Sequence, residues 1–154
     1  MKRSLLAAIL LLAASALAAP PCLAAGETIG VVRNSAGDAA ILRAGKTIPA
    51  APGTKLLAGD TLATGPDGSM GAILRDNSSL SLGPGSRLAI SDFRFSPAEG
   101  NLGLLVRISK GTMAYLSGLI GKLAPESARF ETPVATIGIR GTRFAIKVGE
   151  PPPQ

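Results

Sequence analysis

The sequence has 154 residues, a formal net charge of +6, no histidine, no tryptophan and a single cysteine. Its basic residues are scattered, and one Tyr and four Phe offer few aromatic surfaces, so the composition argues against a nucleic-acid-binding protein. Histidine is the commonest general base and metal ligand, and its absence leads us to expect no enzyme, no metal site and no cofactor.

Residues 1–25 have the pattern of a secretory signal peptide. A short positive head precedes an almost unbroken apolar run, and cleavage sites after small residues exist at Ala18, Ala24 and Ala25. The apolar run is short for a membrane span, so we expect a periplasmic or secreted protein with no stable membrane span after cleavage. Cys22 falls in the removed segment, because the prolines directly before it do not suit a lipoprotein signal.

Residues 26–149 are divided by glycines and prolines into short runs in which apolar and polar residues alternate. Period-two alternation is typical of strands with one buried face. The sequence has no clear fixed-period repeat, which argues against a solenoid. We therefore predict one all-β domain of about a dozen short strands in antiparallel hairpins without helical crossovers, as in a β-sandwich, a jelly roll or a small barrel. The expected strands cover 28–33, 39–43, 46–48, 55–57, 61–63, 69–75, 79–82, 87–95, 102–109, 112–116 and 127–132, followed by two strands within 132–148.

Two segments of this domain are less regular. Residues 117–123 place Leu119, Ile120 and Leu123 on one helical face, whereas two glycines weaken a helix, so a short helix and a mobile flap are both compatible with the sequence. Residues 150–154 form a Pro-rich tail that cannot extend a central strand.

The segment Thr132–Val148, TPVATIGIRGTRFAIKV, reads as two short strands broken by Gly141. Pro133 cannot donate a ladder hydrogen bond, so we place it at the start of the first strand. Ile137 and Ile139 alternate with polar positions, which gives one apolar face. Gly141 interrupts the pattern and predicts a bulge or a close backbone approach.

Two interpretations of this bend remain open. In one, the segment is an edge hairpin that closes the β core. In the other, Arg140, Thr142 and Arg143 present hydrogen-bond donors to a binding partner. Strand parity places Arg140 on the polar face with Thr136 and Gly138, which makes it the first residue to test.

Three motifs of the chain resemble the FecR-like domain, an envelope sensor and regulator module of bacteria. GTKLLAGDTLATG, from Gly53 to Gly65, resembles the G-x-x-L-x-x-G-D-x-L-x-T-G motif of that domain. AILRDNSSLSLGP is similar to the next motif, with Asn77 in the place of a glycine, and asparagine tolerates the left-handed turn. TPVATIGIRGT resembles the closing motif. The positions that these motifs assign to the architecture are Gly59, Asp60, Asp76, Pro133, Gly138 and Gly141.

The resemblance implies an antiparallel β-sandwich, jelly-roll-like, outside the cytoplasmic membrane. It also implies an interaction or sensor domain that binds an envelope protein partner, in signalling regulation. In regulators of the iron-dicitrate type, the domain follows a cytoplasmic anti-sigma segment and a membrane span. Because a signal peptide stands in their place here, we expect the fold and the compartment to carry over rather than the full mechanism. Candidate surfaces are the bend at 140–143 and the loops 96–101 and 116–127.

Two alternatives remain. One is a small-ligand or polysaccharide-binding β module, which the shortage of aromatic side chains disfavours for sugars. The other is an appendage-assembly chaperone, whose domains share the G-x-x-L-x-x-G-D segment.

Overall fold

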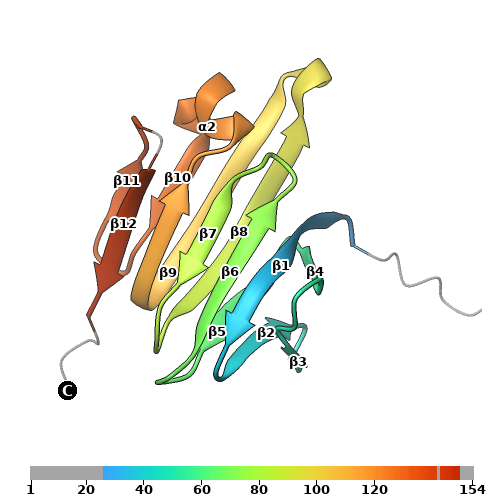
Figure 1. The fold of residues 1–154 in the computed structure, drawn as a ribbon. Coiled ribbons are helices and arrows are strands. Elements are labelled where there is room, and N and C mark those ends of the chain that lie inside the picture. Colours follow the sequence, from blue (N-terminus) through green and yellow to red (C-terminus); the bar gives the residue numbers. More distant parts are fainter. Residues whose placement is uncertain (1–25, 142, 150–154) are drawn as a thin grey trace, which may run out of the picture.

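The structure is a computed structural model that describes residues 26–141 and 143–149, and these form a β-sheet that curls on itself (Figure 1). The predicted signal peptide, Thr142 and the Pro-rich tail lie outside the described residues. Within them are twelve strands, one short α-helix and two 3-10 turns. In chain order these are β1 (Thr28–Ala36), β2 (Ala39–Arg43), β3 (Lys46–Pro49), β4 (Lys55–Leu57), β5 (Thr61–Thr64), β6 (Ser69–Leu74), β7 (Ser79–Leu82), β8 (Arg87–Ser96), η1 (Pro97–Glu99), β9 (Asn101–Leu116), α2 (Leu119–Leu123), η2 (Pro125–Ser127), β10 (Ala128–Glu131), β11 (Thr136–Gly138) and β12 (Arg143–Val148).

The long strand β9 belongs to both layers of the curled sheet. Its first half pairs with β8 and β10, and its second half pairs with β7 and β12. The halves meet at Gly111, whose φ of 90° favours glycine and where a Cβ would collide with the backbone of Ser86. The two strands predicted at 102–109 and 112–116 are therefore one strand with a bend at this glycine. One layer has the order β3-β2-β5-β8-β9-β10-β11, and the other has the order β4-β1-β6-β7-β9-β12.

The core lies between the two layers and is lined by alternate residues of their strands. Leu88 and Ile90 of β8 and Leu80 and Leu82 of β7 are buried in one common apolar cluster. Three aromatic rings join the layers near the C-terminal end of β9: the Tyr115–Phe130, Phe130–Phe144 and Tyr115–Phe144 ring centroids are 4.7, 4.8 and 5.5 Å apart. The predicted all-β fold of about a dozen strands with period-two burial is confirmed.

One strand pair departs from the prediction of antiparallel hairpins without helical crossovers. β10 runs parallel to the first half of β9, with Ala128 opposite Leu104. Parallel neighbours need a crossover connection. Here α2 and η2 provide it, so residues 117–123 contain the short helix rather than an irregular flap. No helix in the described part of the chain has the length and apolar character needed to cross a membrane.

Candidate functional site

The segment that carries the predicted partner-binding residues does not fold as a hairpin. β11 pairs with β10 in one layer, whereas β12 pairs with the second half of β9 in the other layer. The expectation of an edge hairpin is therefore wrong in its pairing, although each strand lies at an edge. Gly141, which has a φ of 156°, lies in the short link between the layers, where a non-glycine residue would be strained.

The alternation predicted for this segment is confirmed. Ile139 is buried, and Phe144 and Ile146 are partly buried against the core. Arg140 and Arg143 are exposed on the opposite side, as the strand parity requires. The third predicted binding residue, Thr142, lies outside the described residues.

Pro133 lies in the turn between β10 and β11 rather than at the start of a strand. The Thr132 N–H donates to the Ala135 carbonyl at 2.8 Å, and the Thr132 hydroxyl accepts the Ala135 N–H at 3.0 Å. Proline is favoured in such a turn because its fixed φ suits the first central position. Its neighbour Val134 is 93% exposed at the tip.

A hollow of about 460 Å³ opens beside Arg140. Gly138, Ile139 and Arg140 line one side of it, and Pro125 and Glu126 of η2 line the other. Two of the predicted surfaces, the bend and the loop 116–127, are thereby brought together. The loop 96–101 contributes no residue to this hollow.

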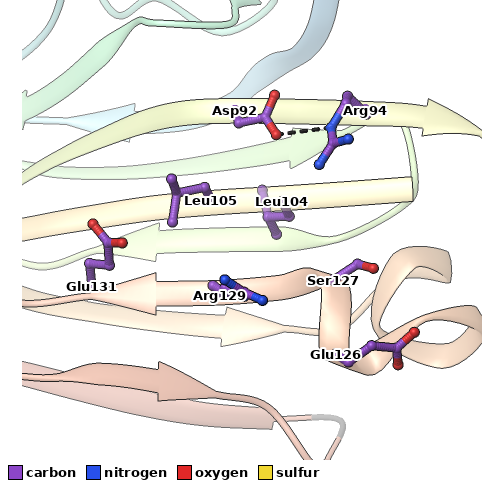
Figure 2. A pocket seen from close by; sticks show the side chains of 8 residues that line it. All are labelled: Asp92, Arg94, Leu104, Leu105, Glu126, Ser127, Arg129 and Glu131. Carbon is purple, nitrogen blue, oxygen red and sulfur yellow. Dashed lines mark hydrogen bonds and ion pairs between the residues drawn. The ribbon is translucent and has the colours of Figure 1, made fainter. Parts of the chain in front are cut away.

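A second hollow, of about 390 Å³, adjoins the first at Glu126 and runs over the outer face of β8, β9 and β10 (Figure 2). Acidic and basic side chains alternate across it. The Arg94 Nε donates to the Asp92 carboxylate at 3.0 Å. Glu131 accepts the Nε of Arg107 at 2.5 Å.

Arg129 and Arg140 lie on the two sides of the η2 turn, and neither makes an ion pair with a residue in the described part of the chain. Arg129 stands opposite Gly138 in the β10–β11 register, and Arg140 lies two residues beyond Gly138. A guanidinium presents a planar fork of donors that matches a carboxylate. The two arginines, with the exposed Glu126 between them, can therefore bind charged groups of another molecule. They are called the η2 arginines below.

Apolar side chains are exposed along the chain just before the η2 turn. Leu119 and Leu123 of α2 are 39% and 60% exposed, and Leu116 at the end of β9 is 49% exposed. Sequence reasoning placed the two helical leucines on one face and did not identify Arg129 or Glu126 as neighbours of the bend. The only signal for Arg129 is its place on the polar face of the strand 127–132.

Gly59 and Asp60 belong to a structural clamp rather than to the hollow. Asp60 is 1% exposed and accepts the Nε of Arg43 at 2.8 Å and its Nη2 at 2.6 Å. It also accepts the backbone N–H of Leu57 at 2.8 Å, which closes the β4–β5 turn. The hydrogen bond and charge of Asp60 raise the pKa of Arg43 above its ordinary value. Gly59, with a φ of 88°, supplies the left-handed residue of this turn.

Asp76 is the centre of a buried polar network. Its carboxylate accepts the Ser78 N–H and hydroxyl at 3.0 and 2.6 Å and the Ile120 N–H at 3.2 Å. The Ser78 hydroxyl also lies 2.9 Å from the Tyr115 hydroxyl and accepts the Gly118 N–H at 3.0 Å. Burial raises the pKa of Tyr115 above its ordinary value of 10.0, and the Ser78 hydrogen bond opposes the shift. The network anchors the crossover helix to the β6–β7 turn.

Neither the clamp nor the network leaves a buried side-chain polar atom unsatisfied in the described residues. No group of three Asp, Glu or Cys side chains is placed to hold a metal ion there. Both aspartates are thus fully used by the fold, whereas the η2 arginines of the two hollows remain available to a partner.

The comparisons with known proteins give one match. A family model described as FecR protein matches residues 60–152, which is more than half of the chain. No curated protein and no solved structure matches. The match includes Asp60, Asp76 and the whole β9–β12 region, so the chain belongs to the FecR family.

Proposed function

We propose that the protein is an exported FecR-like interaction domain that binds an envelope protein partner and acts in the regulation of signalling. The FecR family is generally involved in signalling regulation. One observation carries the proposal: the bend at Arg140 and the η2 turn face each other across an open hollow.

The chemistry of this surface suits a protein partner. The η2 arginines offer charge-assisted hydrogen bonds, and Leu119 and Leu123 of the adjoining helix offer exposed apolar area. Arginine is enriched at the centres of protein interfaces, where desolvation strengthens its hydrogen bonds. Apart from Ser127, the side chains that line the two hollows are charged or aliphatic, with no aromatic ring to stack on a sugar. This favours a protein partner over a polysaccharide.

The test is the substitution Arg140→Ala in the full chain, with Arg87→Ala as the matched control. Arg87 is an exposed arginine at the start of β8 and lines neither hollow. Truncation of a hot-spot arginine at the centre of an interface weakens binding by roughly 30-fold or more, whereas an exposed substitution changes the free energy of unfolding by less than about 0.5 kcal/mol.

We therefore expect Arg140→Ala to abolish co-purification with the partner while the melting temperature stays nearly constant. Arg87→Ala should leave both unchanged. If Arg140→Ala unfolds the domain, or if both variants retain the partner equally, the assignment of this surface is wrong.

A further inference from the structure

The strand β12 is the longest of the four strands that end a layer of the described structure. Four strands lie at the ends of the two layers: β3, β4, β11 and β12. The first three have four, three and three residues, and β3 ends in Pro49. β12 has six residues and contains no proline. Its register to β9 runs without a bulge from Arg143 to Val148. Natural proteins blunt edges by shortness, proline, bulges or charged side chains, and of these β12 has only the charged side chains, Arg143 and Lys147.

The second side of β12 has no partner within the described residues. Its pairing is with β9 alone, and no further backbone or side-chain hydrogen bond to a described residue involves 143–148. In an antiparallel pair, the N–H and C=O groups of alternate residues point away from the neighbour. On β12 these groups are available to another strand.

The side chains of β12 indicate what that strand must carry. Arg143 and Lys147 are exposed on the outer face, and Phe144 and Ile146 are partly buried on the inner face. The β9 residues opposite the two cations are Leu116 and Thr112, respectively. Neither is acidic, and neither cation has an ion pair in the described part of the chain.

A second copy of β12 carries no carboxylate to pair with these two cations. Antiparallel pairing about a two-fold axis keeps each side chain on its own face, and the register centred on Ala145 sets Arg143 of one copy opposite Lys147 of the other. Like charges directly opposite each other destabilise a strand pair. The same two cations attract a strand that has carboxylates at the facing positions.

We propose that β12 accepts an added strand from the protein partner, with acidic residues opposite Arg143 and Lys147 and apolar residues opposite Phe144 and Ile146. The recognised pattern is acid, apolar, any residue, apolar, acid, because the two cations are four residues apart. Backbone hydrogen bonds to the edge provide affinity, and the alternate side chains provide specificity. The inference rests on the proposed partner-binding function and adds how the partner docks.

The probe is a synthetic peptide with the sequence S-E-V-T-V-E-S, compared with S-K-V-T-V-K-S, on protein purified after expression of the full chain. We expect the acidic peptide to bind and to slow amide hydrogen exchange in β12 while the edges of β3, β4 and β11 stay unaffected. The double variant Arg143→Glu/Lys147→Glu should weaken the acidic peptide by about tenfold, since two cross-strand pairs change from attraction to repulsion, and should favour the lysine peptide. The control Arg87→Glu/Lys110→Glu makes the same charge change on exposed residues of the other layer and should leave binding unchanged.

Several results would overturn the inference. They are no binding of the acidic peptide, binding without protection of β12, equal loss in both double variants, or a dimer of the unliganded protein that uses β12. If one of these occurs while Arg140→Ala still loses the cellular partner, the strand addition is wrong and the proposed function stands. If Arg140→Ala and the β12 double variant both retain the partner, the proposed binding surface is wrong as well.

Discussion

Asp76 fixes the crossover helix to the sheet, and its replacement by Asn should destabilise the domain strongly. The carboxylate is fully buried and accepts three hydrogen bonds, from the N–H and hydroxyl of Ser78 and from the N–H of Ile120. Its backbone carbonyl accepts the Leu119 N–H at 2.7 Å. The side chain thus connects the β6–β7 turn to a helix more than forty residues later.

Asparagine has nearly the same shape as aspartate but only one acceptor oxygen. In either amide orientation, the NH₂ group of Asp76→Asn faces the backbone N–H of Ser78 or that of Ile120. A buried donor without an acceptor costs about 1–3 kcal/mol, and a hydrogen bond to a charged group contributes about 1.5–3 kcal/mol. We expect a loss of about 2–4 kcal/mol, a large share of the 5–15 kcal/mol typical of a domain, and a melting temperature lower by roughly 10 °C.

The assay is urea unfolding followed by circular dichroism and by the fluorescence of Tyr115, the only tyrosine of the chain. The control is Asp67→Asn, the same chemical change at an exposed aspartate whose side chain makes no hydrogen bond to a described residue. Such a change should cost less than about 0.5 kcal/mol. If Asp76→Asn is no more destabilising than Asp67→Asn, the network does not hold the crossover in place.

Three further predictions concern the parts that support the site. Arg43→Ala leaves the buried Asp60 without its ion pair and should lower the free energy of unfolding in urea by about 2 kcal/mol. The penalty is smaller than for a fully buried pair because Arg43 is partly exposed. An unchanged urea midpoint would show that the clamp is dispensable. Burial raises the pKa of Tyr115, so the folded state holds the hydroxyl proton of this residue more tightly than the unfolded state does. The stability that this proton contributes is therefore complete below pH 10.0 and is lost as the pH rises through the pKa of the folded state. Tyrosinate absorbance should appear at higher pH in folded than in urea-unfolded protein, and coincident titrations would contradict the burial argument. Gly118→Ala places a Cβ against the backbone of Asp76 and should lower the free energy of unfolding by more than about 2 kcal/mol. In the control Gly138→Ala, the added Cβ has no atom within 4 Å, so stability should change by less than about 0.5 kcal/mol. Equal melting temperatures of the two variants would refute the close packing at the crossover.

Alternation along the sequence predicts which side of each strand faces the core. Ile139 is buried and Arg140 is exposed because successive residues of a strand point to opposite faces. The turn at Asn77 is also predictable, since its φ of 64° is a conformation that asparagine tolerates. These properties depend on residues close together in the chain.

The partner of each strand depends on distant residues and could not be predicted. The sequence 132–148 looks like a hairpin, and nothing in its period-two pattern indicates that β11 and β12 join different layers. The residues around Arg140 are likewise brought together by contacts between distant parts of the chain. Arg129 and Glu126 reach it because β10 returns parallel to β9, and a parallel return depends on a helix that the sequence leaves undecided.

The most direct test of the account is site-specific photo-cross-linking in cells that make the full chain. The photoreactive residue replaces Glu126, which lines both hollows, so that the η2 arginines stay intact. A second protein carries it at Arg87, away from both hollows. We expect one dominant envelope-protein adduct from position 126, none from position 87, and loss of the adduct when Arg140→Ala is added. Equal adducts from both positions, or an adduct from position 126 that survives Arg140→Ala, would contradict the assignment of this surface to partner binding.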